Sequence, residues 1–250
     1  MHRIILPTIF PSLFLFGEDL MNVFKSAVLA AALILGGAAA SAATFTTNTY
    51  DNGWYRNDGI HGPTNTNIIT GVSGSFSFRS FFAFNLASAV GQTVTSAKIS
   101  FFGANGSFVS PLGTETLGLF DVGTSAASIV NGTAGTAGYS DLGSGNSYGT
   151  HIYSAPSGTL MQAFSVSLTS AALTDINSLL SGSNYDFLIG SHLLTVGSTA
   201  ERLWSGSGFL PAASLTLETT PPVPLPAGLP LLLAGLGAFG IAARRKRKAA

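Results

Sequence analysis

The sequence contains no cysteine and few charged residues. Of its 250 residues, only 9% are Asp, Glu, Lys or Arg. Without cysteine there is no disulfide, no thiolate metal site and no cysteine nucleophile. The folded part must therefore be stabilised mainly by burial of apolar side chains. Long apolar runs are also scarce, because they are confined to the two ends of the chain.

The C-terminal tail combines an apolar run with a basic end. From Leu225 to Ala243, 19 residues carry no charged or strongly polar side chain. As a helix they would extend about 29 Å, close to the thickness of a bilayer hydrocarbon core. Five basic residues follow at once: Arg244, Arg245, Lys246, Arg247 and Lys248. Such a cluster stays on the cytoplasmic side, which favours a transmembrane helix over a buried C-terminal helix with a solvated end.

A proline motif overlaps the start of the apolar run, Val223-Pro224-Leu225-Pro226-Ala227. This motif, the apolar span and the basic cluster, in that order over residues 220–250, resemble the PEP-CTERM class of sorting signals in its VPLPA variant. The resemblance implies that an exosortase, a membrane-embedded cysteine protease, recognises the motif and cuts nearby. The preceding domain would then be released to the cell surface or exopolysaccharide. The two prolines are expected to keep the motif extended and accessible to a protease.

The N-terminal part contains a second targeting pattern. A short basic segment begins at Met21, an apolar stretch runs from Ala27 to Leu35, and Ala40-Ser41-Ala42 has the form of a cleavage signal. Residues 21–42 are therefore interpreted as a secretory signal peptide, removed after about Ala42. Residues 1–20 add another apolar stretch and two acidic residues before it. We interpret them as a mis-assigned start, with Met21 as the initiator.

Residues 43–219 are the expected mature domain. They contain four basic and nine acidic residues, which gives a net charge of about −5. An acidic domain without a basic patch argues against nucleic-acid binding. The length of this part suits one domain with a substantial hydrophobic core.

The mature part shows the period of two that is typical of β-strands. Phe82 and Phe84 share the parity of Phe76, Phe78 and Leu86, whereas Phe81 has the opposite parity, so that these rings are expected on different faces. These residues belong to the segment SFSFRSFFAFNL (residues 75–86), which is long for one strand, and Ser80 is expected to break it. Further strands are expected at residues 94–103, 115–122, 162–169, 184–192 and 212–219.

One helix is expected between Ser170 and Leu180, with Ser170 as the N-cap and Gly182 near the C-cap. Residues 131–148 are rich in Gly, Ser, Asn and Thr and are expected to form a loop. Many short strands, one short helix and no alternation of strand and helix predict a mainly β fold. The expected architecture is an antiparallel β-sandwich of jelly-roll type.

A second resemblance concerns the opening strands of the mature part. Arg79-x-x-Phe82-x-Phe84-Asn85-Leu86, followed by the segment Val94 to Ile99, is similar to DNRLRE-type modules. Those modules are jelly-roll domains of bacterial surface proteins and polysaccharide-active enzymes, and some bind carbohydrate. The resemblance implies a fold more than a function.

Signals for catalysis are weak. The segment Gly145-Asn146-Ser147-Tyr148-Gly149 has the pattern G-x-S-x-G, but a nucleophile elbow needs a strand before the serine and a helix after it. Here a strand-like stretch follows. His61, His151 and His192 occur singly, without the spacing of a metal pair. No close pair of carboxylates at a strand end suggests glycoside hydrolysis. We therefore expect no enzymatic activity, no catalytic residue and no metal site.

One stretch has the composition of a sugar-binding site, Tyr50 to Asp58 (YDNGWYRND). Aromatic rings pack on the apolar face of a pyranose, while carboxylates and amides bind its hydroxyls. Trp54, Tyr55 and Asp51 are therefore candidate carbohydrate contacts. The alternative is that Trp54 and Tyr55 only close one end of the sandwich.

Two further candidates are weaker. Trp204 is a similar candidate, but it has fewer polar neighbours in the sequence than Trp54 has. Asp51 and Asp58 could contribute to a structural Ca²⁺ site, but they lack the spacing of a calcium loop, and no cofactor is expected.

Two hypotheses for function follow. The first is an exported, non-enzymatic surface or matrix protein that passes transiently through the inner membrane, with an exosortase as its partner. The second is a secreted carbohydrate-binding module that acts on a matrix polysaccharide.

Overall fold

The computed structural model describes residues 42–102, 106–208 and 211–220. Between Ser41 and Pro221 the chain forms one compact unit. The strands are β1 Thr44–Asn48, β2 Asp51–Arg56, β3 Asn67–Ser73, β4 Phe76–Asn85, β5 Thr93–Phe101, β6 Thr114–Phe120, β7 Ser147–Ser154, β8 Phe164–Ser167, β9 Asp186–Leu193, β10 Ala200–Gly208 and β11 Ala213–Thr220. The helices are a 3₁₀ turn η1 Ala87–Ala89 and the α-helices α2 Ala126–Val130, α3 Gly135–Asp141 and α4 Ser170–Leu180.

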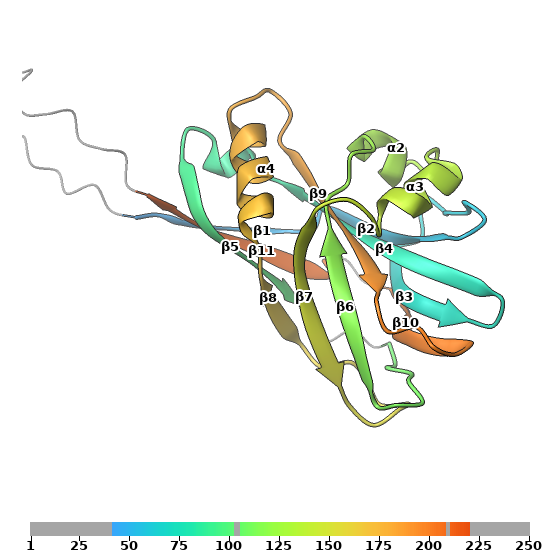
Figure 1. Cartoon of the computed structure of the whole chain (residues 1–250). Helices are drawn as coiled ribbons and strands as arrows, with labels where there is room; N and C mark the ends of the chain where they lie inside the picture. Colours follow the sequence, from blue (N-terminus) through green and yellow to red (C-terminus); the bar gives the residue numbers. More distant parts are fainter. Residues whose placement is uncertain (1–41, 103–105, 209–210, 221–250) are drawn as a thin grey trace, which may run out of the picture. The chain divides into compact units, whose positions relative to one another are not determined.

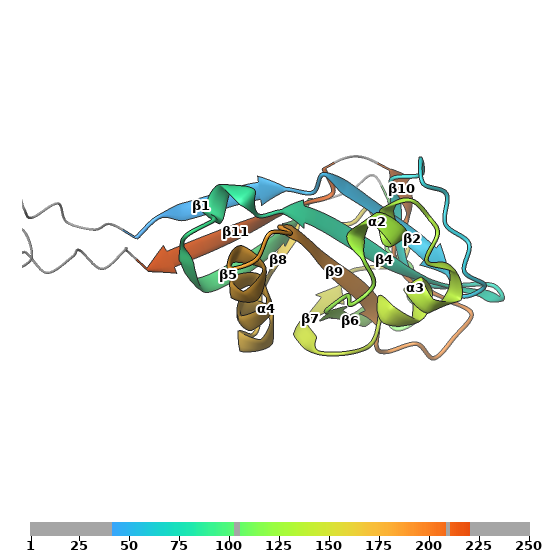
Figure 2. The ribbon, with the colours of Figure 1, turned by 90° about the horizontal axis from the view of Figure 1, so that it is seen from above.

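The strands form two antiparallel sheets (Figures 1 and 2). The first sheet has the order β1-β11-β5-β8 and the second has the order β10-β3-β4-β9-β6-β7, with β2 paired to β4. If β2, β3 and β10 are set aside, the remaining eight strands form two four-stranded sheets, β1-β11-β5-β8 and β4-β9-β6-β7, with the neighbour order of a jelly roll. The predicted mainly β, antiparallel sandwich is confirmed.

The inner core lies between the two sheets. The second sheet contributes Phe82 and Phe84 from β4 and Leu117 from β6, and the first sheet contributes Ile99 and Leu215, all fully buried. Helix α4 closes one end of this core with Ala172, Ile176 and Leu180. Burial of this apolar surface is the main source of stability in a chain without disulfides.

An outer core lies on the other face of the second sheet. Phe81 and Ala83 of β4 and Tyr55 of β2 pack there against Ile129 of α2 and Leu142, which follows α3. Figure 2 shows both helices lying along β2 and β4. The second sheet is therefore covered on both faces in this region.

The parity prediction for β4 is confirmed, but its consequence is different. Phe81 and Phe84 do lie on opposite faces, yet both have 0% exposed side chains. The helices α2 and α3 cover the face that carries Phe81. Alternation therefore separates two cores here instead of a core and a solvated surface.

The prediction of a single helix is wrong. Helix α3 lies within the Gly-rich region that was expected to be a loop, and α2 comes directly before that region. The Ser125 side chain accepts a hydrogen bond from the Ser128 N–H and begins α2. The Arg79 Nη1 donates to the Tyr139 and Ser140 carbonyls at 2.9 Å in the last turn of α3. Tertiary contacts of this kind stabilise short helices that have poor intrinsic propensity.

Helix α4 has the predicted bounds, but Thr169 is the N-cap instead of Ser170. The predicted break at Ser80 is also wrong, because β4 is continuous. Its partners change near that residue, from β3 at residues 76–78 to β9 at residues 80–85. The Ser80 hydroxyl binds both backbone groups of Ile69, at 2.9 Å from its N and 3.0 Å from its O. It thereby provides hydrogen-bond partners for the β3 backbone at the point where β3 no longer pairs with β4.

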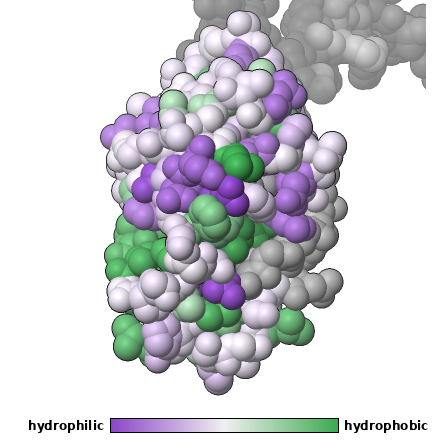
Figure 3. Space-filling view, turned by 90° about the vertical axis from the view of Figure 1, so that its right-hand side faces the viewer, coloured by the Kyte–Doolittle hydropathy of each residue, from purple (hydrophilic) through white to green (hydrophobic). Residues whose placement is uncertain are grey.

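The surface mixes polar and apolar side chains. Figure 3 shows a compact hydrophilic patch on the face at the right of Figure 1, with apolar areas beside and below it. Among the described residues, large apolar side chains with high exposure include Leu112 at 74% and Ile152 at 69%. Scattered exposure of this kind is normal for a folded domain.

Candidate functional site

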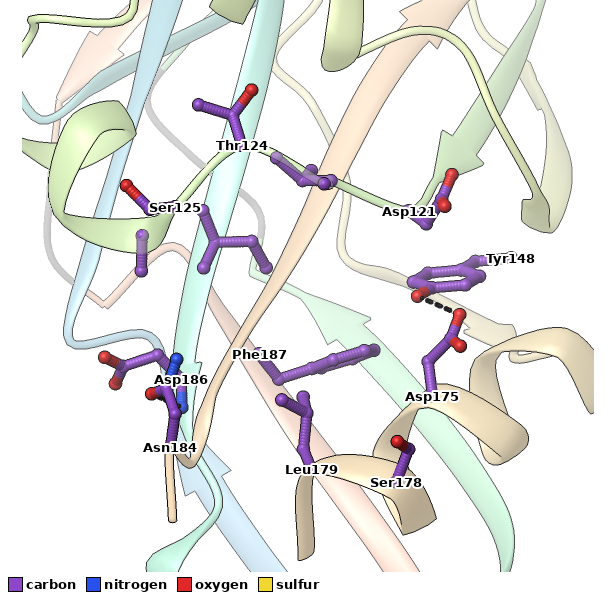
Figure 4. A pocket seen from close by; sticks show the side chains of 14 residues that line it. Asp121, Thr124, Ser125, Tyr148, Asp175, Ser178, Leu179, Asn184, Asp186 and Phe187 are labelled. Atoms are coloured by element: carbon purple, nitrogen blue, oxygen red, sulfur yellow. Dashed lines mark hydrogen bonds between the residues drawn. The ribbon is translucent and has the colours of Figure 1, made fainter. Parts of the chain in front are cut away.

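A cleft of about 350 Å³ opens between α4 and the segment that connects β6 to α2. Figure 4 shows its lining side chains. They come from four separate parts of the chain: Asp121, Val122, Gly123, Thr124, Ser125 and Ala126; Tyr148; Asp175, Ser178 and Leu179; and Asn184, Asp186, Phe187 and Leu188. The fold alone therefore assembles this site.

One wall of the cleft holds Asp121, Tyr148 and Asp175. The Tyr148 hydroxyl donates to Asp175 Oδ2 at 2.7 Å, and Figure 4 shows this bond. Burial raises the pKa of the Tyr148 phenol, and the hydrogen bond to Asp175 raises it further. The Tyr148 phenol therefore stays protonated, and its hydroxyl donates the hydrogen bond that fixes the position of the Asp175 carboxylate.

The Asp121 carboxylate lies at the end of β6 and is held by the backbone. Its Oδ1 accepts the Asn146 N–H at 2.7 Å. Gly145 has φ +87°, and a Cβ at that position would collide with Asp121 Oδ1, so glycine is required for this approach. Burial raises the pKa of Asp121, and the negative charges of Asp175 and Asp141 add to that effect.

The opposite wall holds Asn184 and Asp186 at the start of β9. The Asn184 Oδ1 accepts the Asp186 N–H at 3.1 Å, and Asp186 Oδ1 accepts from Asn85 Nδ2 at 3.3 Å. Burial raises the pKa of Tyr50 to about 12, with further contributions from the charges of Asp186 and Asp51. This phenol is therefore protonated at neutral pH.

Apolar side chains lie between the two polar walls. In Figure 4, Phe187 and Leu179 lie between Asp175 on one side and Asp186 on the other. Phe187 belongs to the inner core and is 2% exposed. The cleft thus combines an apolar floor with acceptors on both sides, which is the general composition of a site for a polar small molecule.

The predicted carbohydrate contacts are not gathered on one exposed face of β2. The Tyr55 side chain is fully buried in the outer core, where its hydroxyl donates to the Ile129 carbonyl at 2.8 Å. Trp54 points to the other face of β2 and makes an edge contact with Phe78, with ring centroids 5.2 Å apart. Asp51 is partly buried, and its Oδ1 accepts the Asn52 N–H at 2.7 Å. Tyr55 offers no ring surface to a ligand, because strand alternation turns it inward.

The weaker candidates are also explained by the fold. Trp204 is fully buried and stacks on Phe164 at a centroid distance of 5.8 Å, so it belongs to the inner core. Asp51 is the first residue of β2, whereas Asp58 lies beyond its last residue, Arg56, with which it forms an ion pair. At about 3.3 Å per residue, the strand separates the two carboxylates too far for a shared cation.

The histidines and the G-x-S-x-G segment lie in different places. His61 Nδ1 lies 2.8 Å from the Trp54 carbonyl, and the His151 ring stacks on Phe164 at 4.3 Å. Among the described residues, no group of three or more His, Asp or Glu side chains could hold a metal. Ser147 is the first residue of β7, so the segment leads into a strand instead of a helix.

The predicted cleavage signal at Ala40 and Ala42, the sorting motif and the basic cluster fall largely outside the described residues, which include only Ala42. Among the residues that the structure describes, no helix has the length and apolar character needed to cross a membrane. The predicted span from Leu225 to Ala243 lies outside them.

Comparison with protein families identifies the C-terminal segment. Residues 222–248 match the model of the PEP-CTERM protein-sorting motif. The chain carries a PEP-CTERM sorting signal. The match contains Val223–Ala227 and the basic residues 244–248, and it begins two residues after the end of β11 at Thr220. A PEP-CTERM motif implies sorting by an exosortase to the cell surface. No curated protein matches this PEP-CTERM chain.

Sequence reasoning missed the acidic cleft. Asp121, Asp175 and Asp186 are 54 and 11 residues apart along the chain, and two of them, Asp121 and Asp186, lie near the ends of predicted strands. Those strand-end positions were the available signal, but only the sheet topology brings β6 and β9 together as neighbours.

Proposed function

We propose that the chain is an exported, non-enzymatic protein of the cell surface or matrix, whose β-sandwich is delivered by exosortase processing of the C-terminal signal. The observation that carries this proposal is the PEP-CTERM motif at residues 222–248, directly behind the last strand of a compact domain. Only residue 221 separates Thr220 of β11 from the motif. Cleavage in the motif would therefore release the whole sandwich, without loss of any strand.

Two proline substitutions test the sorting step. In Pro224→Ala/Pro226→Ala the apolar span is retained and its helicity should improve, but the extended form of the motif is lost. We expect the wild-type chain to give a membrane precursor and a shorter released form, whereas this variant gives only the precursor. Immunoblots of membrane and released fractions, from hosts with and without the exosortase, provide the measurement.

The matched control is Pro221→Ala, which removes a proline outside the motif and should be processed as the wild type is. A second variant lacks Arg244 to Lys248, and some of its precursor should slip through the membrane because the cytoplasmic stop is lost. If the wild type and all proline variants gave one membrane-bound species in both hosts, Val223–Ala227 would be an ordinary linker.

The absence of catalysis is part of the same proposal. Ser147 leads into a strand, which differs from the strand-turn-helix geometry of a serine nucleophile. We expect a fluorophosphonate probe for serine hydrolases to leave the protein unlabelled. Labelling that disappears in Ser147→Ala would contradict the proposal.

A second candidate function is carbohydrate binding, and the acidic cleft favours it. Carboxylates, an amide and hydroxyls surround an apolar floor in a cleft of about 350 Å³. Sugars are recognised by this combination, because their hydroxyls need directed acceptors and donors while their C–H faces need apolar contact. Polysaccharide binding that is lost when cleft residues are replaced would support this candidate.

A further inference from the structure

The cleft carries negative charge without a counterion. Asp121, Asp175 and Asp186 line it, and none of the other described residues in its lining is Lys, Arg or His. Asp58 pairs with Arg56, and both of these residues lie outside the cleft. The three carboxylates therefore act on any ligand as an uncompensated negative field.

The carboxylates are positioned before a ligand arrives. Asp175 accepts the Tyr148 hydroxyl through Oδ2, which leaves Oδ1 for a ligand. Asp121 accepts the Asn146 N–H through Oδ1. Side chains that are already fixed lose little conformational entropy on binding, so they favour a ligand of defined shape. Mutual repulsion between Asp121 and Asp175 is one of the causes that raise the pKa of Asp121, and a bound cationic group would relieve that repulsion.

The size and floor of the cleft restrict the ligand further. Its volume of about 350 Å³ is near the lower limit of small-molecule sites, which extend from about 300 to 1,000 Å³. Leu179 and Val122 add apolar surface between the acidic walls. A bare metal ion would not use this apolar floor, whereas one ring of a sugar chain would contact it.

We propose that the acidic cleft binds an amine-bearing sugar unit, such as a glucosamine residue with a free amino group. The protonated amine would lie at the Asp175 carboxylate, the ring on the apolar floor, and the hydroxyls toward Asn184 and Asp186. This inference rests on the second candidate function and makes it specific, since it selects de-acetylated amino sugars over neutral and acidic ones. Anionic sugars are disfavoured because the lining offers no positive charge.

The test is calorimetric titration of the full chain in detergent with a glucosamine tetrasaccharide. The comparison ligands are the N-acetylated tetrasaccharide and a galacturonate tetrasaccharide. At about pH 6 the amine is protonated and ordinary carboxylates are ionised. We expect binding of the glucosamine oligomer, at least about tenfold weaker binding of the acetylated one, and none of the acidic one. Added salt should weaken the binding because the interaction is electrostatic.

Two variants locate the interaction. Asp175→Asn keeps the shape and the Tyr148 contact but removes one charge, and it should weaken glucosamine binding about tenfold or more. The matched control, Glu218→Gln, removes one charge from an exposed residue of β11 outside the cleft. It should bind as the wild type does. Circular dichroism checks that both variants are folded, and Asp186→Asn replaces Asp175→Asn if that variant is unfolded.

The outcomes separate this inference from the function on which it rests. Equal affinity for the free and acetylated oligomers, lost in Asp175→Asn, would overturn the amine preference but leave carbohydrate binding. Equal losses in Glu218→Gln and Asp175→Asn would show that only net charge matters, and would overturn the assignment to the cleft. No binding of any oligomer would overturn both, whereas the sorting experiment would be unaffected.

Discussion

The two faces of the second sheet are buried in different ways. On the inner face, Phe82 and Phe84 pack against side chains of another sheet. On the outer face, Phe81 and Ala83 of the same strand pack against two short helices. Both faces exclude water completely at these positions. The comparison shows that equal burial can arise in two ways. On the inner face it follows from the alternation of apolar residues along the strand. On the outer face it depends on helices that only the tertiary structure places there.

Polar groups distinguish the outer core from the inner one. The Tyr55 hydroxyl binds α2, Arg79 binds the end of α3, and His61 stacks on Tyr55 at a centroid distance of 4.8 Å. Around Phe82 the inner core is composed of aromatic and aliphatic contacts, such as that between Phe82 and Phe101 at 5.0 Å. The outer core is therefore more sensitive to loss of single hydrogen bonds and to pH.

The largest expected effect tests whether the inner core dominates stability. Phe84→Ala should lower the free energy of unfolding by about 3–5 kcal/mol, because a fully buried ring is replaced by a cavity. Phe81→Ala should lie at the low end of the same range, since short Gly-rich helices can settle into the space. Chemical denaturation of the mature protein measures both. Phe76→Ala, at a side chain that is 41% exposed, should cost less than about 0.5 kcal/mol. Equal and small losses for Phe81 and Phe84 would contradict the two-core arrangement.

A smaller effect concerns hydrogen bonding. Tyr55→Phe should cost about 1 kcal/mol, because the Ile129 carbonyl loses a buried donor. Tyr153→Phe in the inner core should cost less, since the Gln162 N–H that its hydroxyl accepts belongs to an exposed residue that water can reach. Amide exchange should speed up in α2 for the first variant only. Faster exchange throughout the molecule would show that the outer core is not a separate unit.

The smallest effect is the response to pH. Burial lowers the pKa of His61 below its ordinary 6.5, although the Trp54 carbonyl and the Asp51 charge partly oppose it. The unfolded chain therefore binds this proton more readily, so stability is complete above about pH 6.5 and falls as the pH drops toward the folded-state pKa. Between about pH 7 and pH 5, amide protection factors in α2 and α3, corrected for the intrinsic exchange rate at each pH, should fall before those in the inner strands fall. His61→Gln should lose this dependence, and its persistence would assign the effect to His151 or His192.

The strands that could be predicted are those whose alternation is complete. The segments around β4, β5, β6, β8, β9 and β11 were all expected within a few residues. In contrast, the alternation of apolar and polar residues is weak in β3 and β10, because the pairing of these strands requires glycine. Gly71 has φ +127°, and a Cβ there would collide with the Glu201 carbonyl of the neighbouring strand. That requirement is set by the partner strand, which a local pattern does not contain.

The site could not be predicted for a related reason. Tyr55 and Trp54 were grouped by composition, but adjacent residues of a strand point to opposite faces. The acidic cleft combines the end of β6, the start of β9 and a helix between them in sequence. The sorting signal was predictable because its three parts are contiguous and depend on no fold at all.

The pairing of the first strand with the last has a consequence for the timing of folding. Strand β11 lies between β1 and β5 in its sheet, and the Thr219 N–H donates to the Ala43 carbonyl at 3.0 Å. Contacts between residues so distant in sequence form slowly, because the loop they close is almost the whole domain. A chain synthesised and exported from its N-terminus leaves β1 without its neighbour until the final strand emerges. During that interval the unfinished sandwich exposes apolar surface and an open strand edge, so export itself would be the period in which this protein is most prone to aggregate.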